Sequence, residues 1–174
     1  MRGVDVISNG LRFAVLLFLQ VFVLRQVSLG WNGAEYVYLF VTPLFVGLLP
    51  LRTPKPLVVL VAFLFGFGVD LFYETLGLHA AAATLIGYLR QFVLLYLEPR
   101  DGYKVKASPD GKDLSNGWWV QYLGGLSLLY CLSFFAFEAF APQYWQQILL
   151  KTLFTTPLSW LVCVMLALVL RPRL

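Results

Sequence analysis

Charged residues are scarce in this sequence: Asp, Glu, Lys and Arg make up 13% of its 174 residues, whereas soluble domains carry about 25%. Apolar residue types account for 60% of the chain and aromatic ones for 17%, and the mean hydropathy is +0.77. This balance excludes an ordinary soluble domain and predicts an integral membrane protein in contact with the lipid bilayer. The basic excess is expected to reflect membrane topology, so nucleic-acid binding is not predicted.

Cysteine and histidine are also rare, with two Cys and one His in the chain. The sequence contains no Cys and His pair at ligand spacing, no HExxH and no CxxC, so it offers no metal site and implies no cofactor. Cys131 and Cys163 fall inside apolar stretches at different depths. A disulfide needs closely matched positions, so we interpret both as small packing residues.

Long apolar stretches predict an all-α polytopic membrane protein, because membrane barrels show shorter, alternating strands. The sequence forms a single domain, 1–174, and we expect Pro43 and Pro157 to kink their spans. "RQVSLGW" has no small-x-small cleavage site, so the first span is expected to remain a helix. The six predicted transmembrane helices are 11–27, 35–49, 56–74, 76–97, 118–140 and 144–170, and the long loop is 98–117.

The distribution of Lys and Arg predicts the orientation of the chain, because these residues are retained on the cytoplasmic side of short loops. With the amino terminus inside, eleven of the 13 basic residues lie on the cytoplasmic side, and only Arg25 and Lys151 lie outside. Both termini and the loop 98–117 are therefore predicted to be cytoplasmic.

Ionisable side chains gather in one apolar region, residues 66–90. Asp70 and Glu74 are four residues apart and share one face of the third span, and His79 follows a short turn. All three are expected near the outer interface, where water can solvate them, with Glu138 as a neighbour of Asp70. A proton relay or hydrolytic site would need a nucleophile, a metal or an oxyanion pocket, so we favour structural or partner contacts and predict no enzyme.

Arg90 lies deeper, about 10 Å inside the end of the fourth span. It shares a helical face with His79, Ala83 and Gly87, and we expect its side chain to extend along this face to the inner surface. Small residues allow membrane helices to approach closely, either within one protein or between partners. The helix-packing candidates on this basis are Gly66, Ala83, Gly87, Gly124, Ser127 and Cys131.

The third and fourth spans carry a resemblance to a known family. "FGFGVDLF", the turn "GLHA" and a small-residue helix ending in "GYLR" resemble the signature region of the rod shape-determining protein MreD family. The resemblance rests on the spacing of Gly66, Asp70 and Gly77, together with Gly68 and Leu78. The six predicted spans also agree with this family, and the agreement covers essentially the whole chain.

This resemblance implies a six-helix fold like that of the substrate-binding (S) component of energy-coupling-factor vitamin transporters. It also implies a non-catalytic role in the bacterial cell-elongation complex of the inner membrane, controlling cell shape and lateral peptidoglycan synthesis. The implied partners are membrane-anchored MreC, the polymerase RodA with its transpeptidase, and indirectly the actin-like MreB. A substrate-binding subunit of a vitamin-type transporter remains an alternative, which an outer pocket of convergent polar groups would favour.

Overall fold

A computed structural model of the chain describes residues 3–26, 29–31, 34–51, 53–75, 77–99, 103, 115–139 and 142–170. Five helical segments in this part of the chain are long and apolar enough to cross a membrane. The predicted all-α architecture is confirmed, and the molecule has the features of a multi-pass membrane protein. Its helices are α1 (Gly3–Phe18), α2 (Thr42–Leu48), α3 (Lys55–Tyr73), α4 (Leu78–Tyr96), α5 (Asn116–Ala139) and α6 (Trp145–Leu170).

The first helix begins earlier than predicted and changes geometry near its end. α1 starts at Gly3 and continues as a π-helical stretch, Leu19–Val23, and a 3-10 turn, Leu24–Gln26. Isolated π turns often occur at functional positions, because the extra residue re-aims a side chain. Here the π-helical stretch contains the fully buried Gln20.

The second predicted span, 35–49, is wrong as a long helix. Strand β2 (Ala34–Val37) pairs antiparallel with β1 (Leu29–Trp31), residues 38–41 are not helical, and only the seven-residue α2 follows. We call residues 38–41 the strap. Pro43 lies in the first turn of α2, where its missing N–H is tolerated, so it begins a helix instead of kinking one. Pro157 does lie inside α6.

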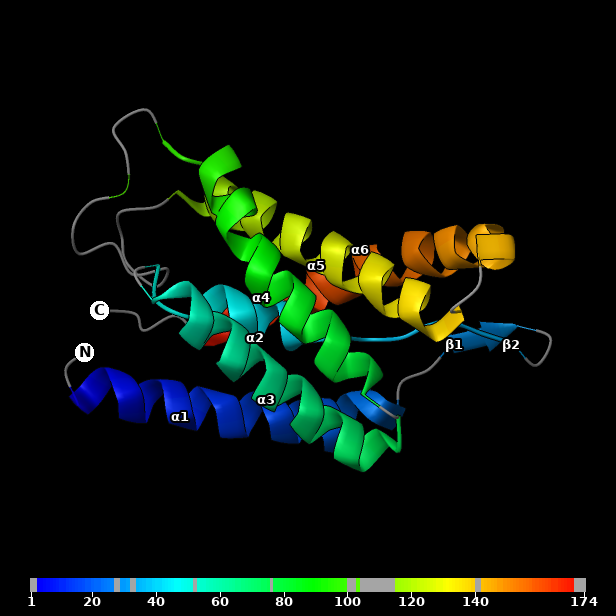
Figure 1. Cartoon of the computed structure of the whole chain (residues 1–174), viewed down its shortest axis with the longest axis horizontal. Coiled ribbons are helices and arrows are strands. Elements are labelled where there is room, and N and C mark those ends of the chain that lie inside the picture. Colours follow the sequence, from blue (N-terminus) through cyan, green and yellow to red (C-terminus); the bar gives the residue numbers. More distant parts are fainter. Residues whose placement is uncertain are drawn as a thin grey trace.

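The long helices lie side by side along the long axis of the molecule (Figure 1). α1 begins and α6 ends at one end, which we call the terminal end, and α4 ends and α5 begins at this end too (Figure 1). The β1–β2 hairpin and the α3–α4 turn lie at the opposite end, which we call the hairpin end. The strap and α2 lead the chain back from the hairpin end toward the terminal end (Figure 1).

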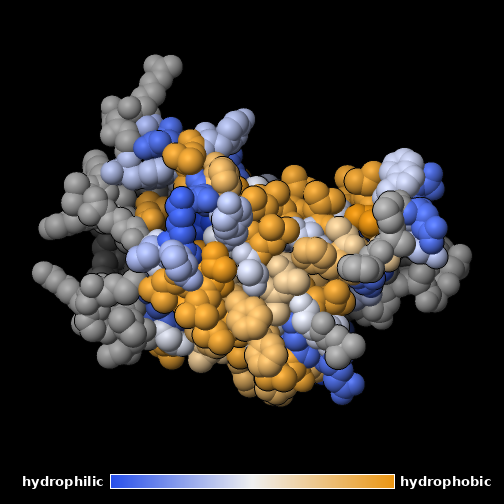
Figure 2. All heavy atoms as spheres, in the orientation of Figure 1, coloured by the Kyte–Doolittle hydropathy of each residue, from blue (hydrophilic) through white to orange (hydrophobic). Residues whose placement is uncertain are grey.

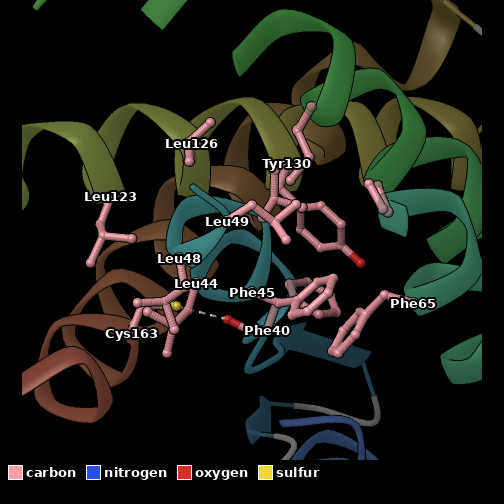
Figure 3. Packing of buried hydrophobic residues seen from close by; sticks show 14 of the residues in the cluster. Phe40, Leu44, Phe45, Leu48, Leu49, Phe65, Leu123, Leu126, Tyr130 and Cys163 are labelled. Atoms are coloured by element: carbon pink, nitrogen blue, oxygen red, sulfur yellow. Dashed lines mark hydrogen bonds between the residues drawn. The ribbon is translucent and has the colours of Figure 1, made fainter. Parts of the chain in front are cut away.

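α2 is the centre of the core, and all seven of its residues are buried. The ring of Phe45 stacks on Phe65 of α3, with centroids 4.4 Å apart. Apolar side chains of α5 and the thiol of Cys163 close around the same helix (Figure 3). The surrounding helices therefore shield this short helix and the strap from lipid, a requirement for non-helical backbone at membrane depth.

Large apolar side chains cover much of the outer surface. Leu71, Leu153 and Met165 are 65%, 65% and 60% exposed. In the view of Figure 2, hydrophobic residues cover most of the middle and hydrophilic ones gather toward the two ends. Such a belt is stable in hydrocarbon and unfavourable in water, which agrees with the membrane assignment.

Candidate functional site

The α3–α4 hairpin brings two backbones into direct contact at Gly66. A Cβ atom at this position would lie 2.5 Å from the carbonyl oxygen of His79 and 2.7 Å from the Cα of Ala80. Both distances are far shorter than van der Waals contact, so a side chain here would force the helices apart. Gly66 therefore serves helix packing within this chain, which is one of the two roles predicted for the small residues; the other is packing between partners.

Asp70 closes the turn by binding the start of α4. Its Oδ1 accepts hydrogen bonds from the Thr75 hydroxyl (2.6 Å) and the His79 N–H (3.0 Å), and its Oδ2 accepts one from the Ala80 N–H (2.8 Å). The first N–H groups of a helix have no partner within the helix, and a carboxylate there also interacts favourably with the helix dipole. Asp70 thus acts as a cap supplied by the preceding helix.

The expectation that water solvates all three ionisable groups of this turn is wrong for two of them. Asp70 and His79 are 5% and 1% exposed, because α3, α4 and α5 enclose them. Only Glu74 is exposed, and it ends α3 in the left-handed conformation with φ of 56°. Gly77, with φ of 84°, completes the reversal before α4.

His79 connects the hairpin to the rest of the bundle. Its Nδ1 lies 2.7 Å from the Tyr130 hydroxyl of α5, and its ring packs against Phe40 of the strap and Phe134. A buried polar ring with a hydrogen-bond partner is a stable arrangement in an apolar surrounding. His79 therefore ties α4 to α5 and to the strap.

The strap carries backbone polar groups through the core, and α6 satisfies several of them. Ser159 Oγ accepts from the Phe40 N–H (3.1 Å) and donates to the Tyr38 carbonyl oxygen (3.2 Å). Thr155 Oγ1 accepts from the Tyr38 N–H (3.4 Å), and the Cys163 thiol donates to the Phe40 carbonyl oxygen (3.3 Å; Figure 3). Cys163 thus has a hydrogen-bonding role besides packing.

Gln20 of the π-helical stretch binds the other side of the strap. Its Oε1 accepts from the Val41 N–H (2.7 Å), and its Nε2 donates to the Leu39 carbonyl oxygen (3.0 Å) and to the Tyr73 hydroxyl oxygen (3.0 Å). The sequence interpretation missed Gln20, Thr155 and Ser159 as structural residues. The sequence signal for such residues is an amide or hydroxyl side chain within an otherwise apolar span, because an unpaired polar group there is costly.

Arg90 does not extend to the inner surface as predicted, and only 3% of it is exposed. Its guanidinium donates to the Tyr122 hydroxyl (2.7 Å) and to the carbonyl oxygens of Leu49 and Pro50, which follow α2. Carbonyls at a helix C-terminus lack intrahelical partners and carry partial negative charge, which favours a cation. Arg90 therefore fixes the end of α2 against α4 and α5.

Glu138 is not a neighbour of Asp70. Its carboxylate forms an ion pair with Lys151 of α6 (2.9 Å), and the Lys151 ammonium also lies over the rings of Tyr38 and Phe135. This pair links α5 to α6 at the hairpin end. The difference arises because α4 and α5 meet through His79 and Tyr130, while Glu138 faces Lys151 of α6.

The small residues of α4 pack within the bundle. Ala83 and Gly87 are buried, and a Cβ on Gly87 would lie 3.0 Å from the Cβ of Ala62 in α3. Of the two roles left open for this stripe, these contacts favour packing of α4 against α3. A bulky residue at Gly87 would separate α3 from α4.

The small residues of α5 also face the chain's own helices. A Cβ on Gly124 would lie 3.4 Å from Nε1 of Trp160, which donates to the Val120 carbonyl oxygen. Ser127 and Cys131 are completely buried. Ser127 and Cys131 thus pack within the bundle, whereas Gly124 is partly exposed and lines a groove beside Trp160.

Tyr103, a described residue inside the predicted loop 98–117, contacts the ends of α4 and α5. Its hydroxyl donates to the Leu94 carbonyl oxygen (2.7 Å), and its ring meets Trp118 edge to face. Burial, and to a smaller extent the negative charge of Glu98, raises the pKa of Tyr103 above its ordinary value. The phenol therefore stays protonated and keeps its donor.

These contacts define what the candidate site can do. Asp70, His79 and Arg90 are each occupied by bonds that hold helices, and the described residues contain no group of three His, Cys, Asp or Glu placed to hold a metal ion. Comparison of the chain with protein-family models, with curated proteins and with solved structures finds no match.

Proposed function

We propose that this chain is a non-catalytic membrane scaffold and regulatory subunit of the bacterial cell-elongation complex, of the MreD type. It would control cell shape and lateral peptidoglycan synthesis by binding MreC, and through the complex RodA, its transpeptidase and MreB. The protein would lie in the bacterial inner membrane. Its activity would consist of holding and positioning these partners.

One observation carries the proposal: the residues whose spacing resembles the MreD signature together shape the hairpin between α3 and α4. Gly66 permits backbone contact, Asp70 caps α4, and Gly77 adopts the left-handed conformation. The charges of the region thereby stabilise the shape of a hairpin. A protein that works by presenting a rigid surface to partners needs such a hairpin.

The same proposal assigns a topology. Five long helices, together with the strap and α2, would make six crossings, with both termini in the cytoplasm and the hairpin end outside. An extended segment bonded by neighbouring side chains is an acceptable crossing, because the protein encloses it. The fold would then be of the kind found in the S component of energy-coupling-factor transporters.

Co-purification in mild detergent tests this function. The chain, tagged and expressed together with full-length MreC from the same bacterium, should retain MreC, and an unrelated single-span protein should be lost. Absence of MreC from a folded, monodisperse preparation would contradict the scaffold proposal. A small molecule recovered in stoichiometric amount would instead support a vitamin-type transporter subunit.

A further inference from the structure

The α3–α4 hairpin leaves a large groove on its outward face. Its volume is about 1130 Å³. Small residues of α4, Ala80, Ala81 and Thr84, line it together with larger side chains of α3, including Phe67 and Leu71. The α3–α4 hairpin lies toward the viewer in Figure 1, and Figure 2 shows this face of the molecule.

We propose that this groove binds the single membrane-spanning helix of the bitopic partner, and that this helix carries a basic side chain at its outer end beside Glu74. The inference rests on the proposed function, since it specifies where and how the scaffold holds that partner. Ala83 and Gly87 of α4 are buried within the chain, and Gly87 packs against α3, so a partner helix on this hairpin would use the outward face that Ala81 lines.

The length of the groove favours a helix over a lipid chain. It extends along α3 from Val59 to Glu74, which corresponds to about 22 Å at 1.5 Å per residue. A lipid chain in one leaflet reaches only the bilayer midplane, about 15 Å from the surface of the hydrocarbon core. A transmembrane helix follows the whole length.

The shape of the groove suits close helix packing. Ala81 is exposed, whereas the neighbouring walls rise through Phe67 and Leu71, which are 45% and 65% exposed. Helices associate in membranes where small residues let the backbones approach, because lipid tails offer no hydrophobic driving force for their association. The small side chain of Ala81 and the larger side chains of Phe67 and Leu71 beside it therefore leave room for one helix.

The charge at the hairpin end of the groove identifies the partner further. Both oxygens of Asp70 are already bonded, but within the described residues Glu74 forms no hydrogen bond or ion pair. Glu74 also occupies the left-handed conformation, which is uncommon for residues other than glycine, Asn and Asp and often accompanies function. A free carboxylate at the mouth of an apolar groove is complementary to a Lys or Arg on the bound helix.

Site-specific photocrosslinking provides a direct test. A photoreactive amino acid at Ala81 should crosslink to co-expressed full-length MreC, and the same amino acid at Ala136, an exposed alanine of α5, should not. Equal crosslinking at both positions would overturn the proposal. Crosslinking at Ala81 to a second copy of this chain, or to phospholipid alone, would overturn it in favour of those occupants.

Two variants test the shape and the charge. Ala81→Leu should reduce co-purified MreC by about tenfold, since it fills the floor, and Ala136→Leu should not. Glu74→Lys should reduce it by about threefold or more, because it replaces the proposed ion pair with repulsion between two cations. If unaltered protein retains MreC and both groove variants retain it equally, the groove proposal is wrong and the scaffold function stands. If unaltered protein retains no MreC, the function itself fails.

Discussion

Removing the Asp70 carboxylate is the sharpest test of the hairpin. In Asp70→Asn, the remaining oxygen can keep the Thr75 and His79 bonds, but the amide nitrogen then faces the Ala80 N–H. One buried donor left without an acceptor costs about 1–3 kcal/mol. Asp70→Leu leaves both backbone N–H groups unpaired, and the cost becomes about 2–6 kcal/mol out of a typical 5–15.

These free energies predict separable melting temperatures. At about 2–4 °C per kcal/mol for a chain of this size, Asp70→Asn should lower Tm by about 2–12 °C. Asp70→Leu should lower it about twice as far and reduce the yield of folded protein. Thermal unfolding in detergent, followed by size-exclusion chromatography of heated samples, measures both.

Glu74→Gln is the matched control, because it removes an exposed carboxylate one turn away and should leave Tm unchanged. Asp70→Leu with the stability of the unaltered protein would refute the capping argument. So would an Asn variant as unstable as the Leu variant. A stable Asn variant that folds but no longer retains the partner proposed above would indicate that the charge itself has a function.

Three further predictions follow from the packing and topology. Gly66→Ala should prevent folding or lower Tm strongly, because its Cβ meets the α4 backbone, whereas Gly10→Ala, inside α1 with nothing within 4 Å, should not lower Tm in the same assay. Arg90→Lys should lower the free energy of unfolding by about 2 kcal/mol, measured as a lower Tm, since one ammonium cannot make all the guanidinium bonds. Reporter fusions after Leu174 should be active in the cytoplasm and fusions near Gln143 outside; an external carboxyl terminus would exclude the six-crossing topology.

The helices α3, α5 and α6 could be placed from the sequence because each is a long apolar run. Their observed bounds, Lys55–Tyr73, Asn116–Ala139 and Trp145–Leu170, differ from the predicted ones by at most two residues. The hairpin turn was also accessible, since Gly77 and the short polar break mark it. Burial of Asp70 and His79 was not, because depth along one helix does not reveal which neighbours cover it.

The sequence by itself determined the solvent, because 60% apolar and 13% charged residues can be buried only in lipid, and lipid in turn demands helices. Only the tertiary structure decided the path of residues 35–49. Their composition resembles a span, yet the strap is held by Gln20, 21 residues before Val41, and by Ser159, 119 residues after Phe40. A helix satisfies its own backbone and is therefore predictable locally, whereas a buried extended segment depends on side chains that folding brings from distant helices.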